Sequence, residues 1–254
     1  MKHRFEVMPM DDAEEEANFL PRGVRVSVTA SPNQDIERTV SLTENLCTEG
    51  LKPIPHITAR QVRDEGHLYS ILNRFNSCGV DDVFVIGGDK KNPVGEFDEA
   101  MDALVHIDDH NENFTVGIGA YPEGHHIMDN NTEVLENKLQ YADYVSTQIC
   151  YDSDRIVEWL SSTDALDNTD VLVGVPGVVE LDYLQRTSER IGVGDSVQRL
   201  NDYGRDVYYP DDLIADLMDT EADIQGFHIN TFNRIKQSVN WVEGYDRLEL
   251  VDFQ

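Results

Sequence analysis

Eight short apolar segments recur along the chain, and a polar or glycine-rich cluster ends nearly every one of them. The segments cover residues 3–7, 25–30, 53–59, 82–89, 114–126, 144–152, 171–178 and 226–234. Most are rich in β-branched residues and nearly continuous in apolar character, which is typical of strands that are buried on both faces. The pattern therefore predicts eight buried strands.

Between these segments the apolar residues follow a helical period. The expected helices cover residues 35–50, 65–79, 96–107, 132–142, 152–163, 181–192 and 210–221. Strand–helix alternation of this kind is typical of a parallel sheet. In a chain of 254 residues it predicts an α/β protein with a single domain, residues 1–254, folded as a (β/α)8 TIM barrel. A doubly wound open sheet is the alternative, but no G-x-G-x-x-G follows the first strand.

The chemistry of such a barrel lies at the C-terminal ends of its strands. Glu6 ends the first expected strand, where a carboxyl among apolar residues can keep its proton near neutral pH and act as a general acid. An ion pair with Arg4 explains Glu6 equally well. Asp89 follows Gly87 and Gly88, which would let a ligand approach the backbone closely. A helix cap or a turn is the alternative role for Asp89.

Two further strand ends carry side chains suited to recognising a flat, polar ring. Residues 120–126 include Tyr121, His125 and His126. With His56 they could form a metal cluster, but adjacent histidines rarely share one ion, and contact with an aromatic cofactor suits them better. Gln148, in the sixth segment, offers two donors and an acceptor for a pterin-like edge. A buried amide with internal partners explains Gln148 equally well.

The charge of the chain indicates its surroundings and excludes one class of partner. The formal net charge is −29, with 49 acidic residues against 20 basic ones, and only six of the basic residues are lysines. Self-repulsion of this size destabilises a compact protein at low ionic strength, and molar salt screens it. We therefore expect a halophilic protein, with an ordinary acidic cytosolic enzyme as the alternative. Nucleic acid is excluded as a partner because no basic stripe would neutralise its phosphates.

The remaining composition indicates a cytoplasmic protein. Cys47, Cys78 and Cys150 form no C-x-x-C pair, which argues against a disulfide framework and a cysteine-rich zinc site. Cys78 and Cys150 are interpreted as buried apolar residues. The N-terminal residues lack the apolar core of a signal peptide, and no apolar run is long enough to cross a membrane.

Taken in order, the strand ends resemble the catalytic barrel of the methylenetetrahydrofolate reductases. That family carries F-E, S-V-T, P-H-L/I-T, R-G-D, A-Y-P-E-x-H, T-Q-x-x-x-D, P-G and F-H-x-x-T-x-N-R at successive strand ends. The corresponding residues here are Phe5-Glu6, Ser27-Val28-Thr29, Pro55-His56-Ile57-Thr58, Gly87-Gly88-Asp89, Ala120 to His125, Thr147 to Asp152, Pro176-Gly177 and Phe227 to Arg234. The resemblance covers about residues 3–235. Each motif is weak alone, but eight in order favour the barrel over the open sheet.

The resemblance implies a flavoprotein of one-carbon metabolism and methionine biosynthesis, an oxidoreductase that reduces 5,10-methylenetetrahydrofolate to 5-methyltetrahydrofolate. It implies non-covalent FAD, with NADH or NADPH as reductant, and a homo-oligomer. The implied FAD contacts are Thr29, His56, Gly87, Gly88, Asp89, Tyr121, His125 and Lys138. The implied catalytic residues are Glu6, as general acid towards N10 of the folate, and Asp89, which would stabilise the resulting cation. The implied folate contacts are Glu6, Gln148, Gln185 and Arg234.

One departure from the family pattern motivates an alternative function. Gly87 stands where the family has the arginine of R-G-D, so a positive charge near the flavin is lost. A flavin-free, folate-dependent methyltransferase or demethylase that uses the same pterin site is therefore the second hypothesis. A non-catalytic folate-binding protein is the third.

Overall fold

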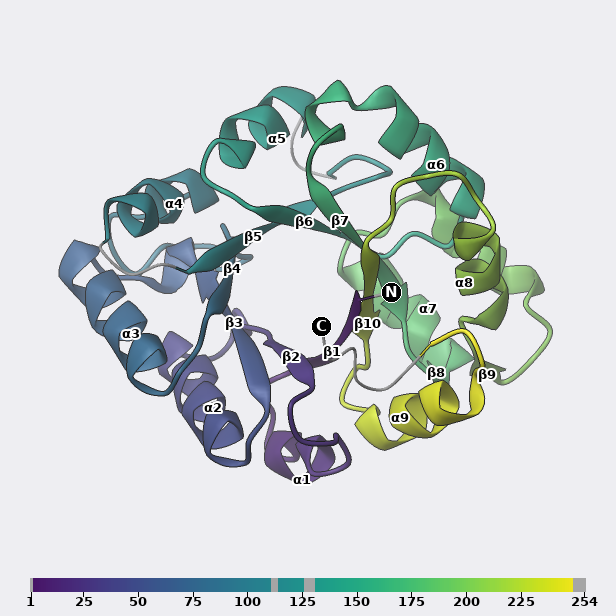
Figure 1. Cartoon of the computed structure of the whole chain (residues 1–254), viewed down its shortest axis with the longest axis horizontal. Coiled ribbons are helices and arrows are strands. Elements are labelled where there is room, and N and C mark those ends of the chain that lie inside the picture. Colours follow the sequence, from purple (N-terminus) through teal and green to yellow (C-terminus); the bar gives the residue numbers. More distant parts are fainter. Residues whose placement is uncertain (1, 111–113, 126–130, 249–254) are drawn as a thin grey trace.

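The computed structural model describes residues 2–110, 114–125 and 131–248, and these residues form a closed barrel (Figure 1). Around the barrel the strands follow the order β1-β10-β7-β6-β5-β4-β3-β2, and every neighbouring pair is parallel. The predicted (β/α)8 TIM barrel is confirmed.

The barrel strands coincide with the eight apolar segments. They are β1 (Lys2–Val7), β2 (Arg25–Val28), β3 (Lys52–Thr58), β4 (Asp82–Ile86), β5 (Thr115–Ala120), β6 (Tyr144–Thr147), β7 (Asp170–Pro176) and β10 (Gly226–Asn230). The helices are α1 (Ala13–Ala17), α2 (Ile36–Thr48), α3 (Glu65–Ser77), α4 (Ala100–Asp109), α5 (Asn131–Leu139), α6 (Ser153–Ser162), α7 (Leu181–Arg190), α8 (Asp211–Met218) and α9 (Ile235–Gly244). Helices α1 and α9 were not predicted.

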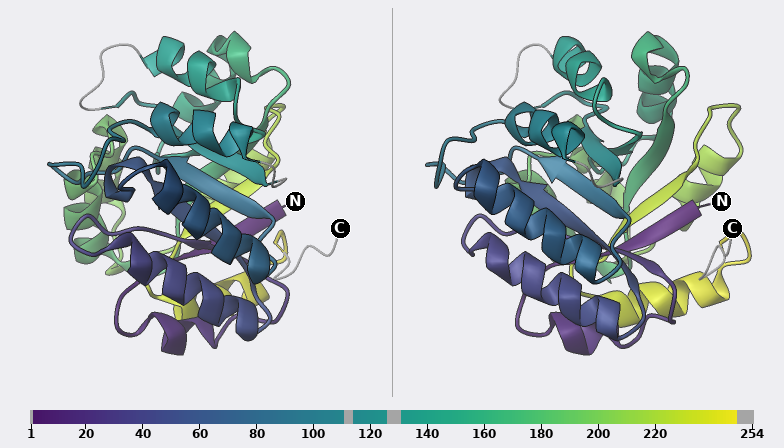
Figure 2. Two further views of the ribbon diagram at one scale, coloured as in Figure 1. Left: turned by 90° about the vertical axis from the view of Figure 1, so that its left-hand side faces the viewer. Right: turned by 60° about the vertical axis from the view of Figure 1, so that its left-hand side comes forward.

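The connection from β7 to β10 differs from the expected simple alternation. It contains both predicted helices, α7 and α8, together with the 3-10 helix η3 (Asp195–Asp202) and a small antiparallel pair of β8 (Val179–Glu180) and β9 (Val207–Tyr208). Helix α8 is the last element before β10, whereas α7, η3 and the small pair precede it. The segment from β8 to β9, residues 179–208, is called the mouth excursion below. It lies on the side of the barrel away from the start of β1 (Figure 2).

Alternate strand residues face outward to the helices and inward to the barrel axis, as the pleat requires. Phe5, Val173 and Phe227 belong to the outer layer and are fully buried in one cluster with residues of the surrounding helices. The inner apolar layer is small and centres on Ile54, Phe84 and Tyr144. Much of the remaining barrel interior is polar, and that polar interior carries the candidate site.

A charged network fills the barrel interior near the N-terminal ends of the strands. Arg4 Nη1 donates to the hydroxyl of Tyr144 at 2.7 Å, and that hydroxyl donates to Asp82 Oδ1 at 2.9 Å. Arg25 Nη1 donates to Asp82 Oδ2 at 3.1 Å. Burial raises the pKa of Asp82 to about 6, and the nearby Arg4 only partly offsets it. Gly117 makes room for this network, because a Cβ there would overlap the ring of Tyr144.

Candidate active site

Glu6 lies inside the barrel, next to the C-terminal end of β1. Its side chain is 13 % exposed, and its Oε2 lies 3.4 Å from Nε2 of His228 on β10. Its backbone carbonyl accepts a hydrogen bond of 2.6 Å from the hydroxyl of Thr231. Burial raises the pKa of the Glu6 carboxyl to about 7. The hydrogen bonds described for Arg4 go to Tyr144, so this geometry does not favour the Arg4–Glu6 pair considered above.

Two buried histidines lie in the barrel interior, and one of them, His228, contacts this carboxyl. His56 on β3 approaches Ser27 Oγ through Nε2 at 2.8 Å, and Ser27 is the β2 residue aligned with Glu6. Burial lowers the pKa of both His56 and His228 well below the ordinary value, and the positive charge of Arg4 adds to the effect. Both rings are therefore neutral near neutral pH. Glu6 thus lacks the close cationic partner that would hold it ionised.

The ends of β3 and β4 form a glycine-bounded edge of the mouth. Gly88 has a φ of +89°, and a Cβ there would overlap Cγ2 of Thr58. Gly87 is different, since a Cβ there would have the Ala100 nitrogen as its nearest neighbour, at an ordinary 3.7 Å. The Thr58 hydroxyl is buried and has no hydrogen-bond partner among the described residues. Asp89 follows at the rim and is exposed.

The β5 edge carries the aromatic and cationic groups. The rings of Tyr121 and His125 meet edge to face with centroids 4.5 Å apart. Burial raises the pKa of Tyr121, and the charge of Asp89 adds to it, so Tyr121 lies near the β4 edge. Lys138 Nζ donates to the Gly119 carbonyl at 3.4 Å, and burial lowers the pKa of Lys138. His126 lies outside the described residues.

The other predicted contacts are held by internal partners. Thr29 stays at the end of β2, where its hydroxyl donates to the Val7 carbonyl at 3.4 Å. Gln148 accepts from the Ile149 nitrogen at 2.9 Å and donates to the Ile191 carbonyl of the mouth excursion at 3.4 Å. Gln148 thus joins β6 to that excursion.

Gln185 lies within the mouth excursion, and Arg234 contacts that excursion from the segment after β10. Gln185 Nε2 donates to Asn201 Oδ1 at 3.3 Å, in a pocket between α7 and η3. Arg234 Nε lies 3.5 Å from Glu180 Oε2, and its guanidinium stands 5.6 Å from the centroid of the Tyr183 ring. No contact of either residue with Glu6 is found among the described residues, so their part in a folate site stays a prediction.

A family model for methylenetetrahydrofolate reductase matches residues 8–243 of the chain. The chain belongs to the methylenetetrahydrofolate reductase family. The family expected from the strand-end motifs is confirmed.

Relatives of known sequence and structure agree with this family and with the fold. Methylenetetrahydrofolate reductase 1 of Schizosaccharomyces pombe is 27% identical over 150 residues, which cover 54% of this chain. The match spans only 25% of that relative's own length. A solved protein from Clostridium thermocellum that binds two copies of 5-methyl-5,6,7,8-tetrahydrofolic acid has a TM-score of 0.62 at 13% identity, over 94% of this chain and 92% of that one. Oxaloacetate acetylhydrolase has a TM-score of 0.54 at 10% identity, over 98% and 82% of the two chains. At these identities the solved structures show the fold alone.

Within this reductase-family barrel, sequence reasoning missed three polar residues of the interior. His228, Ser27 and Thr58 lie in motifs that resemble the family, yet no role was predicted for them. Period-two alternation could have placed Thr58 on the same face as His56. The approach of His228 to Glu6 depends on how the first and last strands align, with Arg4 opposite His228, and no local pattern records that register.

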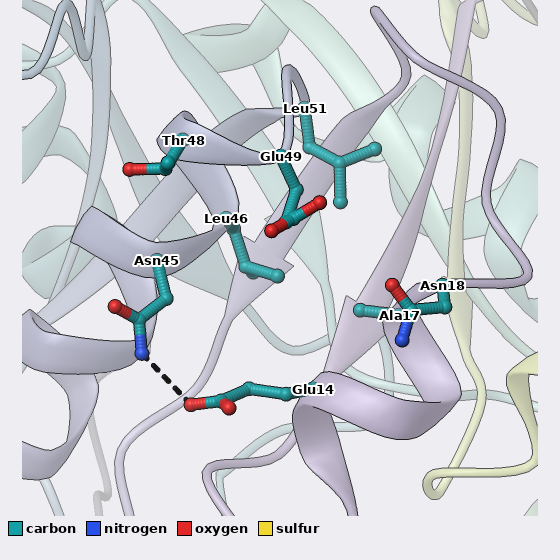
Figure 3. A pocket seen from close by; sticks show the side chains of 8 residues that line it. All are labelled: Glu14, Ala17, Asn18, Asn45, Leu46, Thr48, Glu49 and Leu51. Atoms are coloured by element: carbon teal, nitrogen blue, oxygen red, sulfur yellow. Dashed lines mark hydrogen bonds between the residues drawn. The ribbon is translucent and has the colours of Figure 1, made fainter.

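Two other features of the family barrel lie apart from these residues. Glu123 accepts from the nitrogen and the hydroxyl of Ser196 at 2.9 and 2.6 Å, so it anchors η3 of the mouth excursion. A surface pocket between α1 and the end of α2 includes Glu14 and Asn45, which are joined by a 2.8 Å hydrogen bond (Figure 3).

No group of three or more histidine, cysteine or acidic side chains able to hold a metal is found in the described part of the chain. Likewise, no helix in that part is long and apolar enough to span a bilayer.

Proposed function

We propose that the protein reduces 5,10-methylenetetrahydrofolate to 5-methyltetrahydrofolate, with FAD as hydride carrier and NADH or NADPH as reductant. Membership of the reductase family supports a folate-related activity. The single observation that carries the specific reaction is Glu6. It is a largely buried carboxyl inside the barrel with a pKa raised to about 7.

Glu6 would act as the general acid. At neutral pH a substantial fraction of this carboxyl keeps its proton, which an ordinary glutamate would have lost. Transfer of that proton to N10 of the folate lets the bond between N10 and the methylene carbon break. The nitrogen leaves as a neutral amine, and a cation forms between the methylene carbon and N5. Asp89, a carboxylate at the rim of the mouth, would stabilise that cation through its charge.

The residues of the β3, β4 and β5 ends fit a bound flavin. Gly88 packs closely against Thr58, whose buried hydroxyl has no described partner. Lys138 offers a partly buried ammonium, and Tyr121 and His125 offer ring faces and donors. Bound FAD would supply hydride transfer. The protein residues would bind and orient it, and Thr29 and His56 are further proposed contacts from the resemblance.

Folate itself would occupy the polar interior between Glu6 and the mouth excursion. We propose that Gln148 recognises the pterin ring by hydrogen bonds to its polar edge, and that Gln185 and Arg234 are further folate contacts. The related fold of a protein that binds 5-methyl-5,6,7,8-tetrahydrofolic acid supports a folate-type ligand. We also propose that the protein works in the cytoplasm as a homo-oligomer.

Reconstitution tests this proposal. The purified protein is incubated in high salt with FAD, a nicotinamide donor and methylenetetrahydrofolate, and the products are separated by chromatography. Formation of 5-methyltetrahydrofolate together with retained flavin is the expected result. Folate binding with neither flavin uptake nor reduction would contradict the reductase.

Gly87 favours a second function, the flavin-free folate-dependent methyltransferase or demethylase. A Cβ at Gly87 would meet only an ordinary contact, so packing does not require glycine there. Gly87→Arg restores the family charge and separates the two functions. If the native protein is a flavoenzyme, the arginine strengthens FAD binding. If the variant gains flavin binding that the native protein lacks, the second function is favoured.

A further inference from the structure

Two cysteines that are far apart in the sequence meet between α2 and α3. Cys47 lies in the last turn of α2 and Cys78 caps the end of α3. Their sulfurs are 3.2 Å apart, and Cys47 donates to Cys78. Both side chains are half-buried, so Cys78 is not the fully buried apolar residue that the sequence predicted, whereas Cys150 is fully buried as expected. The spacing of cysteines along the chain could not show this contact.

The two helices are held in place independently of the thiols. Arg74 of α3 donates to both carboxylate oxygens of Glu44 on α2 at 2.8 Å, and to Glu37 at 2.7 Å. Cys47 and Cys78 also pack against the same buried apolar cluster. The sulfurs therefore stay close, and a bond of about 2.0 Å requires only a small further approach.

We propose that Cys47 and Cys78 form a reversible disulfide by exchange with a small disulfide such as oxidised glutathione. The thiolate of one cysteine attacks the small disulfide and releases one small thiol. The other cysteine then attacks the mixed disulfide and releases the second small thiol. Two protein thiols are oxidised, one small disulfide is reduced, and the two protein protons leave on the two small thiols.

The surroundings of the pair determine the rate of this exchange. Burial raises the pKa of the Cys47 thiol to about 12, and the hydrogen bond to Cys78 adds to the effect. Little of Cys47 is ionised at neutral pH, so Cys47 is a poor initial nucleophile. The exchange should accelerate as the pH rises, because thiolate is the reactive species.

The place of the pair in the fold defines the consequence of oxidation. Each helix starts near the mouth and ends before the next strand begins, so the pair lies at the end of the barrel opposite Glu6. The bond would link residues 31 positions apart and restrict the unfolded chain. We expect the unfolding temperature to rise by about 5 °C and folate binding to stay unchanged.

Mass spectrometry and thiol counting test the proposal on the full chain in high salt. After treatment with oxidised glutathione, the mass should fall by two hydrogen atoms. The thiols counted after denaturation should fall from three to one. Digestion should yield one linked peptide pair containing Cys47 and Cys78 that separates on reduction.

Matched variants make the result specific. Cys150→Ala should lose both remaining thiols on oxidation, whereas Cys47→Ser and Cys78→Ser should form no internal link. The proposal is overturned if three thiols persist in the wild type, if the link involves Cys150, or if stable glutathione adducts accumulate instead. The wild-type peptide map decides the question even if a serine variant does not fold.

Discussion

At the residue scale, the protonation of Glu6 is a consequence of its neighbours. The carboxyl is removed from most of the water, and the nearest basic side chain is a neutral imidazole rather than a cation. Arg4, two positions earlier on the same strand, is engaged with Tyr144. A glutamate in this setting keeps its proton to a higher pH because ionisation would leave a poorly solvated charge.

The same effect makes folding stability depend on pH. The pKa of Glu6 rises from 4.5 to about 7 on folding, so the folded state binds the proton more tightly. The cost of ionising the buried carboxyl is absent below about pH 4.5, grows between the two values and is complete above about pH 7. At most about 3 kcal/mol is involved.

Glu6→Gln should remove this dependence. Relative to wild type, the variant should gain stability as the pH rises from about 5 to about 8. Denaturant unfolding at both pH values, at one salt concentration, measures the difference. A difference between the two proteins that stays constant with pH would mean that Glu6 ionises normally in the fold.

The two neighbouring glycines make a matched pair. Gly88→Ala should destabilise the protein by about 1–3 kcal/mol, because the residue has a positive φ and its Cβ would overlap Thr58. Gly87→Ala should change stability by no more than about 0.5 kcal/mol. Urea unfolding of both variants tests this, and equal losses would show that the β4 end is not shaped as described.

At the element scale, one asparagine joins the segments that follow the first and the last strand of the barrel. Asn233, 3 % exposed, bonds to the nitrogen and the carbonyl of Met8 at 2.8 and 3.1 Å, and to Asp12 at 3.0 Å. These bonds connect the segment after β1 with the turn after β10. Glu6 and His228 lie on the two strands so connected.

Asn233→Ala should therefore cost about 2–4 kcal/mol, since it removes three hydrogen bonds and leaves half-buried polar groups of the Met8 backbone unsatisfied. The residue also has a φ of +55°, which alanine adopts poorly. Asn233→Gly separates the two effects, because glycine tolerates that φ but makes no side-chain bonds. If the glycine variant matched wild-type stability in thermal unfolding, the hydrogen bonds would not matter.

The elements that the sequence predicted are those with a strong local signal. The eight barrel strands are largely buried on both faces, so most of them appear as nearly continuous apolar runs, although β1 carries His3, Arg4 and Glu6. Helix α1 has only five residues, too few to establish a period. Helices α7 and α8 have the same kind of apolar periodicity, and that pattern does not show which one belongs to the mouth excursion.

The site was predictable to the extent that it depends on strand ends. Glu6, Asp89 and Tyr121 could be selected because barrel topology collects strand ends at one mouth. Lys138 lies in α5 and was implied by the family resemblance alone. Contacts between distant strands could not be predicted. The approach of His228 to Glu6 joins residues 222 positions apart, and it follows from barrel closure rather than from any local motif.

At the scale of the whole molecule, net charge should control stability. The formal net charge is −29, so the acidic side chains of the folded chain repel one another, and salt weakens that repulsion. The thermal midpoint, followed by circular dichroism, should rise strongly between about 0.1 M and about 2 M KCl. An unchanged midpoint over that range would contradict adaptation to high salt.

The central claim is that a protonated Glu6 drives folate reduction, and single-turnover formation of 5-methyltetrahydrofolate tests it most directly. Product formation by Glu6→Gln is compared with that by wild type at saturating methylenetetrahydrofolate, with folate binding measured on the same samples. The amide cannot donate the proton to N10. We predict a loss of about 10²–10⁴-fold in rate with folate still bound. A Glu6→Gln protein that forms product at the wild-type rate would contradict the claim.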